Sequence, residues 1–159
     1  MADIEVKSEG TVEAPHSIDQ TSLDEKGRLK LPAGYVAYLQ AVGETRLFIT
    51  SWDFRQVRIY PLSTWKANEI LFDAHPEEAE AVALVAKSFG GDAEIDAQGR
   101  VLIPATLREK MQLEKQAMVV DFFNGAINAV TKTVHDERMQ AAMGNLTGSV
   151  ASMKKLGFK

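Results

Sequence analysis

Residues Leu23–Ala33 read LDEKGRLKLPA, and residues Ile95–Ala105 read IDAQGRVLIPA, so nearly the same stretch occurs twice in the chain. Aspartate, glycine, arginine, proline and alanine recur at equivalent positions, and the three leucines of the first copy become isoleucine or valine in the second. The identical residues are those that a tight turn requires, which favours duplication over coincidence. An internal repeat of this kind divides the chain into two related halves.

Each copy predicts the same short series of elements. An apolar residue ends a strand, the Asp-x-x-Gly segment turns the chain, and alternating apolar residues then indicate a half-buried strand. Pro32 and Pro104 suit the first turn of a helix, because the first N–H of a helix needs no partner. Two further strands follow in each half, and in the second half Asn124–Gly125 between them is a strong hairpin signal.

The repeat predicts an α+β protein with two halves, residues 21–62 and 92–134, joined by a helical connector at 63–91. Residues 1–20 are expected to form a flexible leader. Residues 135–159 are expected to form a C-terminal helix, ending near residue 143, and a mobile basic tail. Each half is so short that a core of its own would be marginal, which favours one core shared between the halves.

Composition narrows the possible classes of protein. The 159-residue chain has 45% hydrophobic residues, enough for a packed core, and a net charge of −4. Acidic residues are concentrated in 1–23 and 73–99, whereas 24–72 and 100–159 are net basic. The chain contains no cysteine, which excludes disulfides and thiolate sites and is typical of a reducing compartment. With no long apolar run and no secretory signal pattern, a cytoplasmic protein is expected.

The aspartates and glycines of the two turns are expected to serve structure. Asp24 and Asp96 would hold the turns closed, since an aspartate at the start of a turn accepts hydrogen bonds from backbone N–H groups. Gly27 and Gly99 would supply a positive φ and allow the backbone to approach whatever the turn contacts.

Arg28 and Arg100 allow two interpretations. Each could pair with its own turn aspartate or be a solubilising charge without function. Alternatively, each could read DNA, because arginine makes bidentate contacts with guanine and a two-stranded ribbon fits the major groove. Lys26 and Lys30 alternate with Arg28, so all three are expected on one side of the ribbon, and Gln98 can donate to base edges. The predicted DNA-binding residues are Lys26, Gly27, Arg28, Lys30, Gln98, Gly99 and Arg100.

The paired DEKGRLKLPA and DAQGRVLIPA closely resemble the duplicated DxxxR motif of the MraZ family, within the SpoVT-AbrB superfamily. The resemblance covers about Leu23 to Val130, and includes LFITSW and VRIYPLSTW after the first motif and IPATLREKMQL after the second. Val36 stands where the helix after the motif often carries arginine in that family, and the second copy has Arg108 there.

The resemblance implies a fold and a function. The fold would be a swapped-hairpin β-barrel in which the two halves form a pseudo-dimer with flanking helices. The protein would be a sequence-specific, nucleoid-associated transcriptional regulator without a cofactor. It would bind tandem short direct repeats in double-stranded DNA as a ring-shaped homo-oligomer. It would repress the division and cell-wall gene cluster, including its own promoter.

Two other classes of protein compete with this interpretation. An enzyme is not expected, because His16, His75 and His135 are isolated and the sequence lacks a phosphate loop or nucleophile motif. The second alternative is an AbrB-like oligomeric interaction scaffold that binds no DNA, which the acidic net charge favours. Steep salt dependence of DNA binding would distinguish a DNA-binding regulator from a scaffold.

Overall fold

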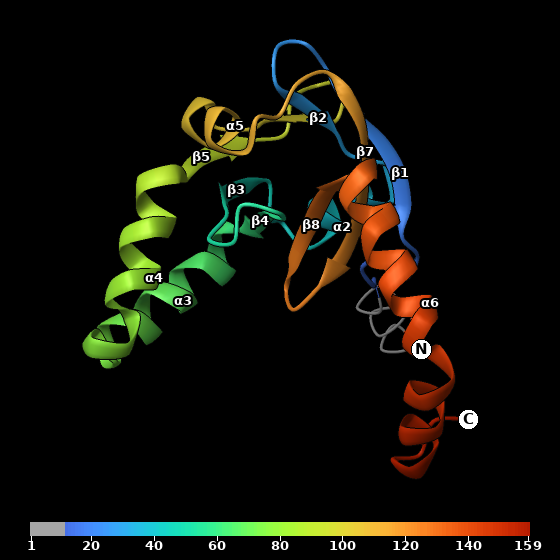
Figure 1. Cartoon of the computed structure of the whole chain (residues 1–159). Coiled ribbons are helices and arrows are strands. Elements are labelled where there is room, and N and C mark those ends of the chain that lie inside the picture. Colours follow the sequence, from blue (N-terminus) through green and yellow to red (C-terminus); the bar gives the residue numbers. More distant parts are fainter. Residues whose placement is uncertain (1–11) are drawn as a thin grey trace, which may run out of the picture.

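The computed structural model describes residues 12–159 and contains, within them, one antiparallel sheet of eight strands and five helices (Figure 1). The strands are β1 (Asp19–Leu23), β2 (Arg28–Lys30), β3 (Arg46–Thr50), β4 (Val57–Pro61), β5 (Gly91–Glu94), β6 (Arg100–Leu102), β7 (Gln116–Phe123) and β8 (Ala126–Thr131). The helices are α2 (Ala33–Ala41), α3 (Leu62–Ala74), α4 (Pro76–Phe89), α5 (Ala105–Met111) and α6 (Lys132–Lys155).

The sheet curls into a nearly closed barrel in which the two halves interlock. Its strand order is β5-β3-β4-β8-β7-β1-β2-β6, and the two end strands, β5 and β6, contact each other. β1 of the first half pairs with β7 of the second, and β5 of the second half pairs with β3 of the first. The equivalent strands β2 and β6 pair with each other, as do β4 and β8. This exchange of strands confirms the predicted swapped-hairpin barrel.

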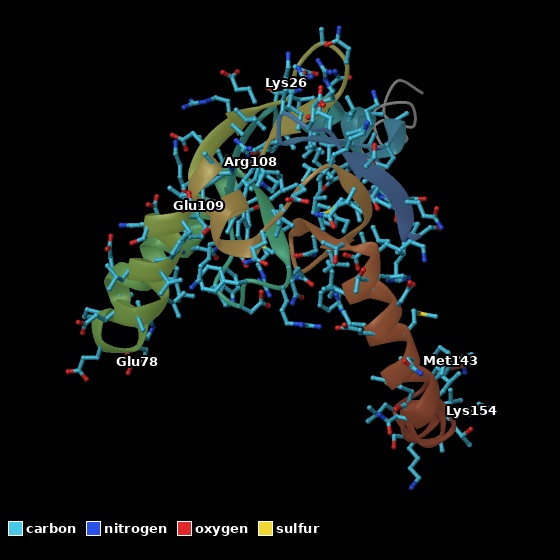
Figure 2. All side chains as sticks on the ribbon, turned by 45° about the horizontal axis from the view of Figure 1, so that its top comes forward. Lys26, Glu78, Arg108, Glu109, Met143 and Lys154 are labelled. Carbon is cyan, nitrogen blue, oxygen red and sulfur yellow. The ribbon has the colours of Figure 1, made fainter. Side chains whose placement is uncertain are left out.

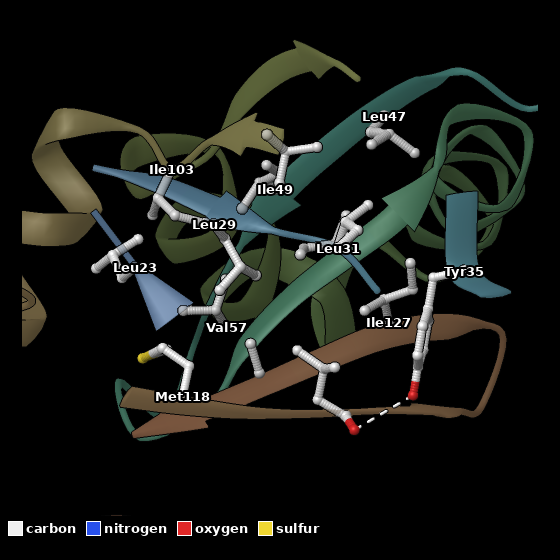
Figure 3. Close-up of a cluster of buried hydrophobic side chains, with 14 of the residues drawn as sticks. Leu23, Leu29, Leu31, Tyr35, Leu47, Ile49, Val57, Ile103, Met118 and Ile127 are labelled. Atoms are coloured by element: carbon white, nitrogen blue, oxygen red, sulfur yellow. Dashed lines mark hydrogen bonds between the residues drawn. The ribbon is translucent and has the colours of Figure 1, made fainter. Parts of the chain in front are cut away.

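One hydrophobic core serves both halves (Figure 3). Leu29 and Val101, which are equivalent in the repeat, are both fully buried where β2 meets β6. Tyr35 of α2 is buried too, and its hydroxyl donates to the carbonyl of Val120 in β7 at 3.2 Å. Because burying a leucine-sized side chain contributes roughly 1.5–3 kcal/mol, neither half could lose its partner without losing most of its stability.

The connector helices attach to one side of the barrel through an aromatic cluster. The indole ring of Trp65 in α3 stacks on Phe48 of β3, with ring centroids 4.4 Å apart, and meets Phe72 edge-on at 5.8 Å. Pro76 begins α4, with Glu77 and Glu78 in its first turn, where carboxylates favour the positive end of the helix. The helical pair was predicted at residues 63–91 and spans Leu62–Phe89, since Gly91 already belongs to β5.

The two ends of the described chain differ from their predicted boundaries. β1 begins at Asp19, inside the stretch predicted as a leader, whereas residues 1–11 lie outside the described residues. The predicted end of the C-terminal helix near residue 143 is wrong, because α6 continues through Gly144 and Gly148 to Lys155. Interior glycines each disfavour a helix by about 1 kcal/mol relative to alanine, which is why the sequence favoured an earlier end.

Between residues 12 and 159, no helix combines the length and the apolar character needed to cross a membrane.

Candidate nucleic-acid interface

The first turn is closed by its aspartate. The carboxylate oxygen Oδ1 of Asp24 accepts from the backbone N–H groups of Lys26 and Arg28, both at 2.9 Å. The Asp24 carbonyl accepts from the N–H of Gly27 at 3.0 Å. The N–H of Arg28, which makes the largest contribution, and the neighbouring donors lower the pKa of Asp24 below its ordinary value. The carboxylate thus stays ionised and fixes the backbone of the turn.

The second turn repeats this arrangement. Oδ1 of Asp96 accepts from the backbone N–H groups of Gln98 and Arg100 at 2.9 Å, and its carbonyl accepts from Gly99 at 3.0 Å. The hydrogen bond from the Arg100 N–H is again the largest cause of a lowered pKa at Asp96. The two turns therefore have the same backbone and the same charged anchor.

Each turn glycine lies beneath a side chain of the opposite half. Gly27 has φ 84° and Gly99 has φ 77°, a conformation that glycine adopts without strain. A Cβ atom at Gly27 would lie 2.3 Å from Nε of Arg108 in α5, whereas one at Gly99 would lie 3.3 Å from Cγ2 of Val36 in α2. The helix of one half therefore covers the turn of the other, with arginine at the first turn and valine at the second.

A short ladder connects the two turns. β2 and β6 pair antiparallel, with Arg28 opposite Leu102 and Lys30 opposite Arg100. Beyond each end of the ladder, the carbonyl of a turn glycine accepts from the opposite half: Gly99 from Leu31 and Gly27 from Ile103, both at 2.9 Å. These bonds hold the two turns in a fixed relation to each other.

Both motif arginines pair with their own aspartates. Nε of Arg28 donates to Oδ2 of Asp24 at 2.8 Å, and Nε of Arg100 donates to Oδ2 of Asp96 at 2.9 Å. The two arginine side chains remain 30% and 27% exposed. Nη2 of Arg100 also donates to the side-chain oxygen of Gln98 at 3.2 Å. Since each aspartate binds only the Nε end of a guanidinium with five donors, the Nη groups are oriented rather than consumed by the ion pair.

The structure separates the lysines that the sequence placed together. Arg28 and Lys30 flank the buried Leu29 on the same face of β2, but the Lys30 ammonium crosses the ladder and donates to the carbonyl of Gln98 in the second turn. Lys26 is exposed in the first turn itself. Arg28 and Lys30 thus share one side of the ribbon, as expected, but the Lys30 ammonium lies at the second turn.

Arg108 was not among the predicted DNA-binding residues, yet it lies at the first turn. Its Nε donates to the carbonyl of Ile103 at 2.9 Å, and its side chain packs on Gly27. Figure 2 shows Arg108 and Lys26 at the same end of the barrel. The sequence did contain a signal for this position, because Arg108 is the equivalent of Val36 immediately after the repeated motif.

Each turn therefore combines its own arginine with a cation from the opposite half: Arg108 at the first turn and Lys30 at the second. Within residues 12–159, no group of three or more histidine, cysteine, aspartate or glutamate side chains could hold a metal ion. The turns also carry carboxylates, but Asp24 and Asp96 are ion-paired with their own arginines and only Glu25 of the first turn is fully exposed. The hydrogen-bond donors and cations beside them suit recognition of a polyanion.

Comparison with known proteins identifies relatives that are named as transcriptional regulators. The family model described as "MraZ protein, putative antitoxin-like" matches residues 91–125. The chain is 32% identical to the transcriptional regulator MraZ of Koribacter versatilis over 106 residues, which are 64% of this chain and 72% of that relative. It is 38% identical to that of Acidobacterium capsulatum over 103 residues, 62% of this chain and 70% of the relative. It is 41% identical to that of Desulfitobacterium hafniense over 102 residues, 62% and 68% of the two chains. The chain therefore belongs to the MraZ family, whose named members are transcriptional regulators.

Proposed function

We propose that this protein regulates transcription by binding double-stranded DNA in a sequence-specific way through its two turns. The observation that carries the proposal is that a cation from the opposite half lies at each turn, beside the motif arginine. This cation is Arg108 at the first turn and Lys30 at the second. Because the swapped fold builds both positive sites, they form only when the two halves are assembled.

The geometry suits reading of base edges. Asp24 and Asp96 hold the Nε ends of Arg28 and Arg100, so each guanidinium points its Nη groups in a fixed direction, toward the O6 and N7 atoms of a guanine. At Arg100, Nη2 also donates to the Gln98 side chain, a contact that a base would share or replace. A pre-positioned arginine loses less side-chain entropy on binding than a free one. The remaining cations, Lys26 among them, supply attraction to phosphates that does not depend on sequence.

The family resemblance supports a more specific proposal. The protein would assemble into a ring-shaped homo-oligomer at the nucleoid and bind tandem short direct repeats. It would repress the division and cell-wall gene cluster, including its own promoter. A ring presents the same turn at regular intervals, so individually weak contacts add through effective concentration.

The test is DNA binding by variants of the motif arginines. The probe is the DNA upstream of this protein's own coding region, if it contains short direct repeats, compared with a scrambled fragment of equal length. Arg28→Ala and Arg100→Ala should each weaken specific binding by about 10- to 100-fold, because a bidentate arginine–guanine contact contributes roughly 1–3 kcal/mol of discrimination. Circular dichroism and native mass should be unchanged.

Arg55→Ala is the matched control. Arg55 is also an exposed arginine in an ion pair, to Glu137 at 2.7 Å, but it lies in the loop between β3 and β4 and belongs to neither turn. Its loss should leave DNA binding within about twofold, as expected for a surface ion pair. If Arg28→Ala or Arg100→Ala unfolds the protein or changes its mass, that arginine serves structure.

The second candidate is an oligomeric interaction scaffold that binds no DNA. The ion pairs of both motif arginines with their own aspartates, together with the net charge of −4, favour it. Salt dependence separates the two candidates. A DNA-binding regulator loses affinity steeply between about 50 and 200 mM salt, as counterion release requires, whereas a scaffold shows no binding even at the lower concentration.

A further inference from the structure

The second turn contains a glutamine that hydrogen bonds hold at its backbone and at its side chain. The N–H of Gln98 donates to Oδ1 of Asp96 at 2.9 Å, and its carbonyl accepts from the Lys30 ammonium. Its side-chain oxygen Oε1 accepts from Nη2 of Arg100 at 3.2 Å. Gln98 is nevertheless exposed to solvent. An exposed side chain held in this way loses less conformational entropy when it binds a ligand than a free one does.

The contact with Arg100 also decides which atoms of the Gln98 amide face solvent. A guanidinium carries donors only, so the amide oxygen turns toward it and the NH2 group points away. The positive charge beside Oε1 polarises the amide and strengthens Nε2 as a donor. A second donor at Oε1 would meet the N–H groups of Arg100, and donors repel each other. Gln98 therefore presents a hydrogen-bond donor to a ligand.

The first turn cannot build this arrangement, although its backbone is the same. Its residue equivalent to Gln98 is Lys26, whose ammonium group offers no acceptor to the neighbouring guanidinium. Lys30, which contacts the Gln98 carbonyl, is equivalent to Leu102, whose side chain has no donor for the Lys26 carbonyl. Of the two turns, only the second can pair an amide with its motif arginine.

We propose that Gln98 reads a base edge as a hydrogen-bond donor beside Arg100, and thereby excludes cytosine from one position of the DNA site. The inference rests on the proposed function, because it requires the second turn to lie in the major groove. In that groove guanine, adenine and thymine each present an acceptor, whereas cytosine presents only its N4 amino group. A donor that faces this amino group leaves both groups unpaired, which costs free energy.

Arg100 keeps its own role in this arrangement. Asp96 accepts from Nε and Gln98 accepts from one N–H of Nη2, so the remaining N–H groups of Nη1 and Nη2 stay available for guanine. The two side chains then read neighbouring bases. Arg100 prefers guanine, and Gln98 accepts any base except cytosine. A glutamine without the arginine contact would instead prefer adenine, which it binds through both its oxygen and its NH2 group.

Selection of DNA by the full-length protein tests this assignment and requires no known operator. The probe is a pool of double-stranded fragments with a randomised central segment, offered in parallel to the parent protein and to each variant. Gln98→Ala should raise the frequency of cytosine at one position about 3- to 10-fold, the effect of one hydrogen bond. It should leave guanine preferred at the neighbouring position that Arg100 reads.

Gln98→Glu reverses the hydrogen-bonding character of the side chain at nearly constant shape. A carboxylate only accepts, so this variant should prefer cytosine, whose N4 amino group donates, at the same position. Gln140→Ala is the matched control, because Gln140 is an exposed glutamine of α6 and belongs to neither turn. It should select the same sequences as the parent protein. Circular dichroism of all three variants should match that of the parent.

Three results would overturn the inference and leave the proposed function intact. If Gln98→Ala selected the same sequences as the parent, or weakened binding equally for all sequences, Gln98 would read no base. If it relaxed only the guanine preference that Arg100→Ala also removes, Gln98 would merely position Arg100. A Gln98→Glu variant that still excluded cytosine would show that this side chain does not cause the exclusion.

Failure of the proposed function would look different. The parent protein would then select no sequence from the pool, or Arg100→Ala would select the same sequences as the parent, and this inference would fall with it.

Discussion

The first turn, residues 24–28, and the second, residues 96–100, have the same backbone but different surroundings. In both, the aspartate accepts two backbone N–H groups at 2.9 Å and one Nε group at 2.8–2.9 Å. In both, a glycine with positive φ closes the turn. The difference lies in the side chains on and around each turn. The first turn carries Lys26 and is covered by Arg108, whereas the second carries Gln98 at the position equivalent to Lys26.

This difference shows which residues the fold requires and which it leaves free. The repeat keeps those that fix φ, anchor the turn or fill the shared core, and changes those that face solvent. Lys30, for example, corresponds to Leu102, which is 52% exposed. The two turns therefore present unlike surfaces on like scaffolds, and the following substitutions test how far the likeness and the difference extend.

The largest effect is expected from the core that both turns share. Leu31→Ala and Ile103→Ala each remove a side chain with at most 1% exposure at equivalent positions. Each should lower the free energy of unfolding by about 2–5 kcal/mol. Because the strands are exchanged between halves, either substitution should destabilise both halves in a single transition. Urea unfolding combined with hydrogen exchange measures this. Loss of protection confined to the mutated half would show that the halves are independent.

The next effect should distinguish the glycines. Gly27→Ala and Gly99→Ala both place a side chain at positive φ, at a cost of roughly 1–2 kcal/mol. Gly27→Ala should cost more, because its Cβ would displace Arg108 from its bond to the Ile103 carbonyl. Thermal unfolding measures the difference. In an Arg108→Ala background the extra cost at Gly27 should disappear; if it persists, Arg108 is not its cause.

A smaller effect should appear in DNA binding when the covering residues are changed. Arg108→Ala should weaken binding about tenfold and reduce the slope of log affinity against log salt by about 1, if its charge acts on a phosphate. Val36→Arg should place a matching cation over Gly99 and steepen the slope by about the same amount. Competition binding at several salt concentrations measures both. Equal slopes in all three proteins would show that these positions do not face DNA.

The sequence could predict much of this fold because its signals are local and repeated. The turn, the following strand and the proline at the start of each helix are encoded within eleven residues, and their duplication indicated one core for two halves. The contact of Lys30 with Gln98 could not be predicted in the same way, because it depends on the antiparallel pairing of β2 with β6. Contacts across the halves are long-range, and local patterns do not specify them.

Two other features differ from the sequence-based expectation for physical reasons. Arg108 reaches Gly27 only because α5 of one half covers the turn of the other. Its position in the sequence, next to the second motif, therefore did not predict a contact with the first motif. The end of α6 was placed too early because Gly144 and Gly148 have low helix propensity. An apolar stripe on the other face of α6 was the stronger signal, since periodic apolar residues continue to Met153.

The smallest expected effect tests whether the two turns are electrostatically equivalent. The hydrogen bonds of each turn lower the pKa of Asp24 and Asp96 below the ordinary value of 3.8. A carboxylate with a lowered pKa stabilises the fold fully above that ordinary value, and the contribution is lost as pH falls through the lowered pKa. Asp24→Asn and Asp96→Asn should therefore lower stability near neutral pH, and their difference from the parent protein should shrink as the pH falls below about 4.

The asparagine variants keep an oxygen that can accept the backbone N–H groups, so they remove the charge while retaining the turn. Urea unfolding between about pH 6 and pH 2.5 measures the free energy of unfolding of each variant. Asp53 provides a positive control, because its hydrogen bonds from Arg55, Arg58 and Gln56 outweigh burial and lower its pKa to about 2. The anchoring hydrogen bonds of the two turns agree in length within 0.1 Å. Both variants should therefore reduce, by the same amount, the loss of unfolding free energy that accompanies the fall in pH. If only Asp24→Asn weakened the pH dependence of the unfolding free energy, Arg108 and Lys26, rather than the shared backbone, would dominate the electrostatics of the first turn.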